Sequence, residues 1–247
     1  MRIAVFGTGT VGQALAARLD ELGNEVTIGT RDVDASRARA AAGGSSAESF
    51  GAWLLGRPSI RLATYADAAA TSEIVVNATS GQVALAALGS AGRENLVGKI
   101  LIDISNPLDF SAGFPPSLFV KDTDSLGEQI QAAFPDTFVV KTLNTLAAEL
   151  MVRPAQLASG QHTVFVSGND AAAKRTVTGI LKQFGHTDVI DLGDISTCRG
   201  TEMYLALWVR TMGALGAELF NIKVVRKEQH DSRLLAGLAD LTSAALD

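Results

Sequence analysis

A glycine-rich turn near the N-terminus constrains the fold of this chain more than any other feature. The apolar residues 3–6 lead directly into Gly7-Thr8-Gly9-Thr10-Val11-Gly12, and a stretch with leucines at helical spacing then ends at Gly23. A second β-branched run, residues 26–28, follows at once. This order of strand, turn, helix and strand is typical of a βαβ unit, so the chain is predicted to begin with a parallel sheet.

The three glycines of this turn have different predicted roles. Gly7 allows the tight turn, Gly9 lets the backbone approach a pyrophosphate, and Gly12 lets the next helix pack closely on the sheet. The pyrophosphate would rest on the helix N-terminus, where unpaired N–H groups attract an anion. We therefore predict that a dinucleotide contacts Gly7, Thr8, Gly9, Thr10, Val11 and Gly12; the alternative is a glycine-rich turn without a ligand.

The second strand ends in Gly29-Thr30-Arg31, about 20 residues beyond the glycines. An NAD site carries Asp or Glu there to accept from the ribose 2′-OH. A guanidinium instead favours a 2′-phosphate, and the hydroxyl of Thr30 can donate one more hydrogen bond. Thr30 and Arg31 thus favour NADP over NAD, unless Arg31 is merely solvated and Asp32 binds the ribose.

Composition excludes several classes of function. Among 247 residues, 19% are charged and 47% hydrophobic, the net charge is −5, and no run of Lys or Arg occurs. Nucleic acid and anionic membranes are therefore not expected partners. The single cysteine, Cys198, excludes an internal disulfide, and a strand at the very N-terminus leaves no room for a signal peptide. We expect a cytoplasmic protein without a membrane span.

Further short apolar runs continue the pattern. Strands are expected at 59–63, 73–79, 99–104 and 138–141, with helices at 66–70, 82–88 and 126–134 between them; segment 37–56 is part helix and part loop. Runs that are apolar on both faces and separated by helices are typical of a doubly wound parallel sheet. The predicted fold is α/β, a Rossmann-type sheet with a smaller C-terminal α/β-to-helical domain.

Polar residues follow three of these strands. In such sheets the ligand lies beyond the carboxyl ends of the strands, so these residues are expected to line one crevice with the glycine turn. The candidates are Asn77, Ala78, Thr79, Ser105, Asn106, Pro107, Thr142, Leu143, Asn144 and Thr145.

The pattern restarts on a smaller scale in the C-terminal part. A strand at 163–166, a helix capped by Asn169 or Asp170 and ended by Gly185, and a strand at 188–192 are expected. Residues 201–220 are predicted to form one long apolar helix, buried against the first domain or in a dimer interface. We therefore divide the chain into an NADP-binding domain, 1–148, and a domain that closes the cleft, 149–247.

Several single residues allow two interpretations. Lys141 is either a catalytic amine or, as we favour, one member of an ion pair. Cys198 beside Arg199 is either an activated thiol or, more in keeping with its surroundings, a buried cysteine. Trp208 and Met212 could contact a flat cofactor, but core positions fit an apolar helix better. His162, His186 and His230 lack ligand spacing, so no metal site is expected.

With these motifs in place, the chain resembles the NADP oxidoreductase, coenzyme F420-dependent family, which includes the cytosolic reductase domain of the STEAP metalloreductases. The resemblance covers nearly the whole length and rests on the glycine turn and on Gly29-Thr30-Arg31, where the family has Gly-Ser-Arg. It rests further on residues 103–107 (Asp-Ile-Ser-Asn-Pro), 139–145 (Val-Val-Lys-Thr-Leu-Asn-Thr) and 166–170 (Val-Ser-Gly-Asn-Asp).

The resemblance implies hydride exchange between NADPH and a planar acceptor, F420 or a flavin such as FMN, in the cleft between the domains. Such a transfer needs the two rings held about 3–3.5 Å apart rather than an acid–base dyad. Thr79, Asn106, Asn144 and Thr145 are expected to orient the nicotinamide and its ribose, no catalytic residue is assigned, and a homodimer is expected.

One position departs from the F420-reducing members, which resemble this chain but carry His where Asn144 stands. Asn there is more similar to the STEAP branch, so F420 and flavin both remain candidate acceptors. Two other functions stay open: an NADPH-binding redox sensor without turnover, and a small-substrate dehydrogenase of the β-hydroxyacid or pyrroline-carboxylate type.

Overall fold

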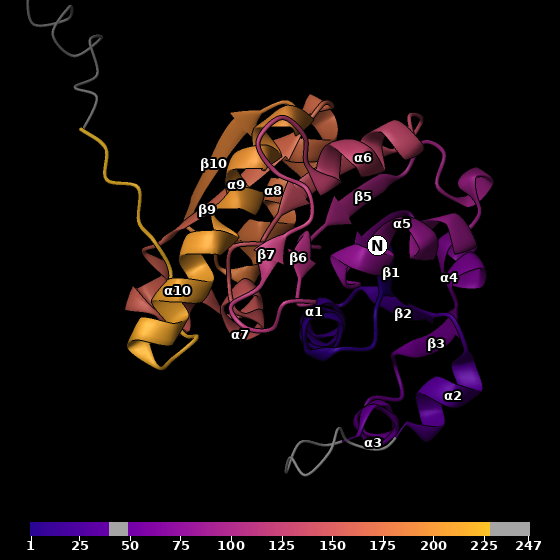
Figure 1. Ribbon diagram of the computed structural model, residues 1–247. Coiled ribbons are helices and arrows are strands. Elements are labelled where there is room, and N and C mark those ends of the chain that lie inside the picture. The colour runs from indigo at the N-terminus through magenta and orange to yellow at the C-terminus, as the bar shows by residue number, and fades with distance from the viewer. Residues whose placement is uncertain (40–48, 228–247) are drawn as a thin grey trace, which may run out of the picture.

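The computed structural model describes residues 1–39 and 49–227 (Figure 1). Within them, one eight-stranded sheet forms the centre of the molecule and a two-stranded ribbon stands beside it. The strands of the sheet are β1 (Arg2–Phe6), β2 (Glu25–Thr30), β3 (Arg61–Thr64), β4 (Ile74–Asn77), β5 (Ile100–Asp103), β8 (Phe138–Thr142), β9 (Thr163–Gly168) and β10 (Asp188–Gly193). The ribbon is β6 (Leu108–Asp109) with β7 (Ser117–Leu118).

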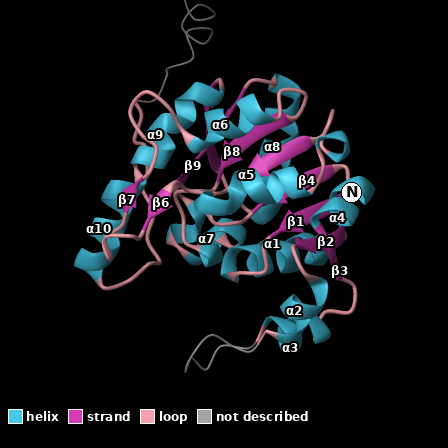
Figure 2. Ribbon diagram, turned by 45° about the vertical axis from the view of Figure 1, so that its right-hand side comes forward, coloured by secondary structure: helices cyan, strands magenta, loops and turns pink. Residues whose placement is uncertain are grey.

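Helices cover both faces of the sheet, as Figure 2 shows. They are α1 (Thr10–Glu21), α2 (Val33–Ala38), α3 (Phe50–Leu55), α4 (Tyr65–Thr71), α5 (Gly81–Ser90), α6 (Leu126–Ala133), α7 (Ala148–Val152), α8 (Ala171–Phe184), α9 (Cys198–Met203) and α10 (Leu205–Leu215). Short 3₁₀ turns lie at Arg93–Asn95, Pro154–Gln156, Ala158–Gly160 and Ile195–Thr197.

The sheet order is β10-β9-β8-β5-β4-β1-β2-β3. All neighbouring pairs are parallel except β8 and β9, which are antiparallel with Val140 opposite Gly168. The chain reverses direction along the sheet after β3, so β1 and β4 are neighbours and the carboxyl ends of the strands open at this switch point. The predicted doubly wound α/β fold is confirmed, with one reversed pair.

Strand β1 shows why both faces are covered. Its residues alternate between two hydrophobic cores: Ile3 and Val5 pack with α1, α7 and α8, whereas Ala4 and Phe6 pack with α4, α5 and α6. A strand that is buried on both sides needs apolar residues at every position, which explains its unbroken apolar run. Phe6 also contacts Tyr65, with the ring centroids 4.7 Å apart.

The predicted strands and helices of residues 1–142 are found close to their expected bounds. In the C-terminal part, Asp170 caps α8 by accepting from the Ala173 amide at 2.7 Å, and Gly185 ends it with a left-handed φ of 109°. The β6–β7 ribbon was not predicted, because each of its strands has only two residues.

The long helix predicted at 201–220 is wrong in its bounds. The helical segment begins earlier, at Cys198, is divided into α9 and α10 at Tyr204, and ends at Leu215 because Gly216 turns left-handed with a φ of 63°. Within one chain α10 is also less buried than expected. Leu205 and Val209 are covered, but Leu207 and Leu215 are each 59% exposed.

The predicted division of domains falls at the start of α7, whereas the sheet continues past it from β8 into β9. The division at residue 148 stays a prediction, and both parts contribute strands to one sheet.

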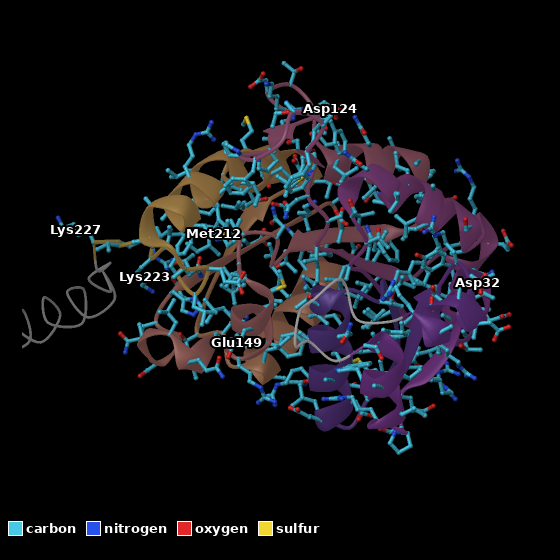
Figure 3. The ribbon with its side chains drawn as sticks, turned by 60° about the horizontal axis from the view of Figure 1, so that its bottom comes forward. Asp32, Asp124, Glu149, Met212, Lys223 and Lys227 are labelled. Carbon is cyan, nitrogen blue, oxygen red and sulfur yellow. The ribbon has the colours of Figure 1, made fainter. Side chains whose placement is uncertain are left out.

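After α10, residues 221–226 return to the amino ends of β9 and β10, where Lys223 and Arg226 pair with Asp188. Figure 3 shows Lys223 on the opposite side of the molecule from Asp32, the residue that follows β2. No described helix is long and apolar enough to cross a membrane.

Candidate active site

The glycine turn has the geometry that a pyrophosphate requires. Gly7 has a φ of 119°, and a Cβ there would meet the Ala78 carbonyl oxygen at 2.6 Å, so only glycine fits. A Cβ on Gly12 would meet the Gly7 oxygen at 2.1 Å, whereas at Gly9 no atom lies within 4 Å. Helix α1 begins beside this open space, and no side chain caps its N-terminus. Amide donors that face open space fit an anionic diphosphate.

The end of β2 carries the residues that suggest a phosphorylated ribose. Thr30 is buried, with its hydroxyl 2.7 Å from that of Ser36, and Arg31 is exposed. Asp32, the alternative ribose partner, caps α2 by accepting from the Ala35 amide at 2.9 Å. Arg39, which the sequence did not single out, donates to the backbone oxygen and hydroxyl of Thr8 at 3.0 and 2.8 Å. A guanidinium thus lies against the glycine turn, next to the end of β2.

A pocket of about 330 Å³ opens at the carboxyl ends of β4, β5 and β8. Strand ends, the start of α5, the β6–β7 ribbon and α10 all contribute side chains to its lining. The lining residues are Val11, Ala78, Thr79, Ser80, Gly81, Ile104, Ser105, Asn106, Leu108, Phe110, Asn144, Leu146, Met151, Leu205 and Trp208. A site of this size with apolar walls and a few polar groups has the form of a small-molecule site.

The structure brings half of the candidate crevice residues together in this pocket. Ala78, Thr79, Ser105, Asn106 and Asn144 line it, as does Val11 from the glycine turn. The other candidates are buried and do not line it: Asn77, Pro107, Thr142, Leu143 and Thr145. The pocket is therefore continuous with the first turn of α1, through Val11.

Hydrogen bonds within the protein fix most of the polar side chains that line the pocket. The hydroxyl of Thr79 donates to Asn77 at 2.7 Å, and that of Ser105 donates to Asp103 at 2.7 Å. The amide of Asn144 donates to Asn106 Oδ1 at 3.0 Å and to the Thr201 backbone oxygen at 3.1 Å. Asn77 itself does not line the pocket, but it holds the Thr79 hydroxyl in place. Its own amide donates to Asp103 at 2.8 Å.

A buried ionic cluster adjoins these polar side chains through Asp103. The Lys141 ammonium is 2.8 Å from Asp103 Oδ2 and 2.7 Å from Glu202 Oε1, and all three side chains are almost fully buried. Burial acts to lower the pKa of Lys141, but the two carboxylates outweigh it and hold the pKa above its usual range. Lys141 is thus a charged structural partner, and the prediction of an ion pair is confirmed.

The Glu202 carboxylate also accepts from two backbone amides at the start of α6, those of Leu126 at 2.8 Å and Gly127 at 3.0 Å. A carboxylate is favoured at this position because the helix dipole is positive there. Glu202 therefore ties α9 to both the sheet and α6.

Cys198 lies beside this cluster. Burial, and then the neighbouring Glu202 charge, raise the pKa of its thiol to about 12. The thiol lies 3.1 Å from the Ser125 hydroxyl and is buried, which fits the structural rather than the nucleophilic interpretation.

His162 and His186 come together although they are far apart in sequence, with ring centroids 6.1 Å apart. The Nε2 of His162 lies near the backbone oxygen of Pro154, and the Nε2 of His186 lies near that of Met151. Neither of these contacts is with another candidate metal ligand. His230 lies outside the described residues. Among residues 1–39 and 49–227, no group of three or more His, Cys, Asp or Glu is placed to hold a metal.

Sequence reasoning missed several residues of the site. A lone carboxylate in the apolar segment around Glu202 was a usable signal, because such a residue needs a buried cationic partner. Leu108, Phe110 and Leu205 gave no signal, since only the three-dimensional arrangement brings the ribbon and α10 to the pocket. Trp208 was expected in the core but is half-buried and lines the pocket.

Comparison with known proteins agrees with this geometry. The family model for NADP oxidoreductase, coenzyme F420-dependent, matches residues 2–107. A crystal structure from Arthrobacter sp. FB24, assigned as an F420-dependent NADP reductase, is 59% identical and has a TM-score of 0.87. It covers 92% of this chain, and the chain covers 100% of it. The chain belongs to the F420-dependent NADP oxidoreductase family.

More distant relatives match in part. The F420-dependent NADP reductase of Methanothermobacter marburgensis is 32% identical over 156 residues, which are 62% of this chain and 66% of that protein. The rat metalloreductase STEAP3 is 27% identical over 221 residues, 87% of this chain but 39% of that protein. The chain thus spans less than two thirds of the length of these two relatives.

Proposed function

We propose that this member of the NADP oxidoreductases transfers hydride between NADP(H) and a planar acceptor of the F420 deazaflavin class. The observation that supports it most strongly is the pocket that begins at Val11, beside the open glycine turn, and is lined by both polar and apolar side chains. The polar side chains suit a carboxamide and ribose, and the apolar side chains suit a second flat ring.

NADPH, when bound, supplies the hydride, and one proton from solvent completes the reduced acceptor. The residues of this chain bind and orient: the α1 amides and glycine turn for the diphosphate, Thr30 and Arg31 for the 2′-phosphate, and Thr79, Asn106 and Asn144 for the nicotinamide end. Leu205 and Trp208 lie on the wall formed by α10, where they keep water from the reacting rings. Positioning of this kind is sufficient for hydride transfer between two cofactors.

The acceptor is tested by supplying the protein with NADPH and an 8-hydroxy-5-deazaflavin, and in parallel with FMN. We expect the deazaflavin absorbance to bleach while NADPH is consumed in equal amount. If FMN alone is reduced, the proposal moves to a flavin acceptor, which the Asn144 position would then explain. Tight binding of NADPH without turnover of either acceptor would favour the sensor, and oxidation of hydroxyacids by NADP would favour the small-substrate dehydrogenase.

A further inference from the structure

Two hydroxyls that line the pocket depend on one buried ammonium group. The hydroxyl of Ser105 donates to Asp103, and that of Thr79 donates to Asn77, whose own amide donates to Asp103. Asp103 in turn accepts from the Lys141 ammonium, which also donates to the backbone oxygen of Ser105. The polar residues at the ends of β4 and β5 are therefore held in place from Lys141 outward.

The third partner of the Lys141 ammonium comes from the C-terminal part of the chain. Glu202 Oε1 lies 2.7 Å from Nζ, and Glu202 belongs to α9. Beside it, the backbone oxygen of Thr201 accepts from the Asn144 amide at 3.1 Å. Two consecutive residues of α9 are thus bonded to the strand ends that carry the polar pocket residues.

Helix α10, which forms one wall of the pocket, depends on this attachment. It follows α9 with one residue between them, and its pocket residues Leu205 and Trp208 lie about one and two turns beyond Glu202. Within the described part of the chain, the one side-chain hydrogen bond of α10 joins Arg210 to Ala206 of the same helix. The position of this wall is therefore set by packing and by the attachment of α9.

Hydride transfer is sensitive to the distance between this wall and the strand ends. In the proposed function the strand ends orient the nicotinamide, and α10 lies beside the acceptor ring. The reacting atoms must approach to about 3–3.5 Å, and a misplacement of about 1 Å can slow a reaction about 100-fold. A buried ion pair suits such a role, because separating its partners leaves an uncompensated buried charge.

We propose that Glu202 is a positioning residue for hydride transfer. By binding Lys141, it holds the α10 wall at a fixed distance from the strand ends that orient the nicotinamide. Glu202 does not line the pocket, so it acts through Lys141 and α10 rather than on the reacting rings. This inference rests on the proposed function and assigns the spacing of the two rings to a buried charge pair.

The test shortens the attachment by one methylene. Glu202→Asp keeps the negative charge but changes its reach, and Glu202→Gln keeps the length but removes the charge. Glu128→Asp is the matched control, because Glu128 pairs with Arg199 and so also joins α6 to α9, without contact to Lys141.

Three quantities are measured for each protein. The first is the rate of hydride transfer in a single turnover of bound NADPH with an 8-hydroxy-5-deazaflavin or FMN, with and without deuterium at C4 of the nicotinamide. The second is the affinity for NADP⁺ by calorimetry. The third is the hydrogen exchange of the α9 and α10 amides, with and without NADP⁺.

We expect both Glu202 variants to slow hydride transfer about 10- to 100-fold. Their affinity for NADP⁺ should change less than about threefold, since the glycine turn, Thr30 and Arg31 are untouched. Exchange of the α9 and α10 amides should become faster in both variants. The Glu128→Asp protein should transfer hydride within about twofold of the wild-type rate.

The wild-type protein provides a further check that needs no variant. A nicotinamide held at the strand ends fixes the groups to which α9 is bonded, so NADP⁺ should slow the exchange of the α9 and α10 amides. If NADP⁺ binds without such protection, the two sides of the pocket are not coupled, and the inference is overturned.

Two results separate the inference from the function on which it rests. If exchange in α9 and α10 becomes faster in the Glu202 variants but hydride transfer keeps its rate, Glu202 is structural only, and the proposed function stands. An equal slowing in Glu128→Asp has the same meaning. If the wild-type protein reduces neither acceptor, the proposed function fails, and the inference fails with it.

Discussion

At the scale of single residues, Arg31 decides the choice of dinucleotide in our proposal. Replacement by Ala removes a charge-assisted hydrogen bond to a 2′-phosphate, which NADH does not carry. We expect Arg31→Ala to weaken NADPH binding by about 10- to 100-fold and NADH binding by less than about twofold. Fluorescence titration with both nucleotides measures this, and equal losses for the two would contradict the phosphate role.

His186 gives the fold a defined sensitivity to acid. Burial, followed by the nearby His162, lowers its pKa to about 4, although its contact with the Met151 carbonyl acts in the other direction. Between the ordinary histidine pKa of about 6.5 and this value, the unfolded chain binds a proton that the folded chain does not. Stability therefore falls as the pH decreases through this range, by about 2 kcal/mol from pH 7 to pH 5.

The matching measurement is urea unfolding at pH 7 and pH 5 for the wild-type protein and for His186→Gln, which keeps a donor for the Met151 oxygen. The variant should lose less stability between the two pH values than the wild type. An identical loss would mean that His186 takes up its proton in the folded state as well.

Some residues could be understood from sequence, and others could not. Glycine spacing revealed the turn at Gly7, Gly9 and Gly12, because this spacing is typical of dinucleotide-binding turns. The partners of Lys141 could not be known, since Glu202 is distant in sequence and only the fold brings the two together at 2.7 Å. Arg39 escaped notice for the same reason, as its contact with Thr8 spans two loops.

At the scale of elements, Glu202 connects α9 with α6 and the sheet. Replacement by Gln keeps an oxygen for the α6 amides but leaves Lys141 with Asp103 alone in a buried site. We expect Glu202→Gln to destabilise the fold by about 3 kcal/mol, the usual cost of breaking a buried ion pair. Denaturant unfolding gives this value directly.

Glu128→Gln provides a matched control, because Glu128 pairs with Arg199 and so also joins α6 to α9. Its side chain and that of Arg199 are 19% and 36% exposed, and solvent weakens such pairs. This variant should cost less than about 1 kcal/mol. If the two variants were equally destabilised, burial would not be what makes the Glu202 contact important.

Long periodic elements were predictable, and short or interrupted ones were not. Helix α8 and the buried strands carry strong hydrophobic patterns with clear end signals. The β6–β7 ribbon is too short to show alternation, and the break between α9 and α10 at Tyr204 has no glycine or proline to mark it. The site was accordingly predictable along the strand ends but not along the wall formed by α10.

At the scale of the whole molecule, α10 presents apolar side chains to solvent, including Leu207 and Leu215, which share one helix face. Figure 3 shows Met212, on the same helix, toward the side of the molecule that carries Lys223 and Lys227. A second copy of the chain would cover such a patch. The homodimer expected from the sequence therefore stays a prediction, and the exposed apolar face of α10 is the surface at which the two copies would meet.

Sedimentation analysis tests this prediction. The wild-type protein should sediment with twice the mass of one chain, and the double variant Leu207→Glu with Leu215→Glu should sediment with the mass of a single chain. Leu55→Glu, at an 85% exposed position in α3, is the control and should leave the mass unchanged. A wild-type protein that sediments as a monomer at micromolar concentration would contradict the prediction.

The contact between Lys141 and Glu202 also sets an order on events during translation. The ribosome delivers β1 to β8 first, at roughly 5–20 residues per second, so the glycine turn and Lys141 emerge before Glu202 is made. Until then Lys141 has one carboxylate instead of two, and the start of α6 lacks its carboxylate from α9. A nascent chain can therefore form its glycine turn before the wall with Leu205 and Trp208 exists. Completion of the acceptor side therefore has to wait until α9 and α10 have been synthesised.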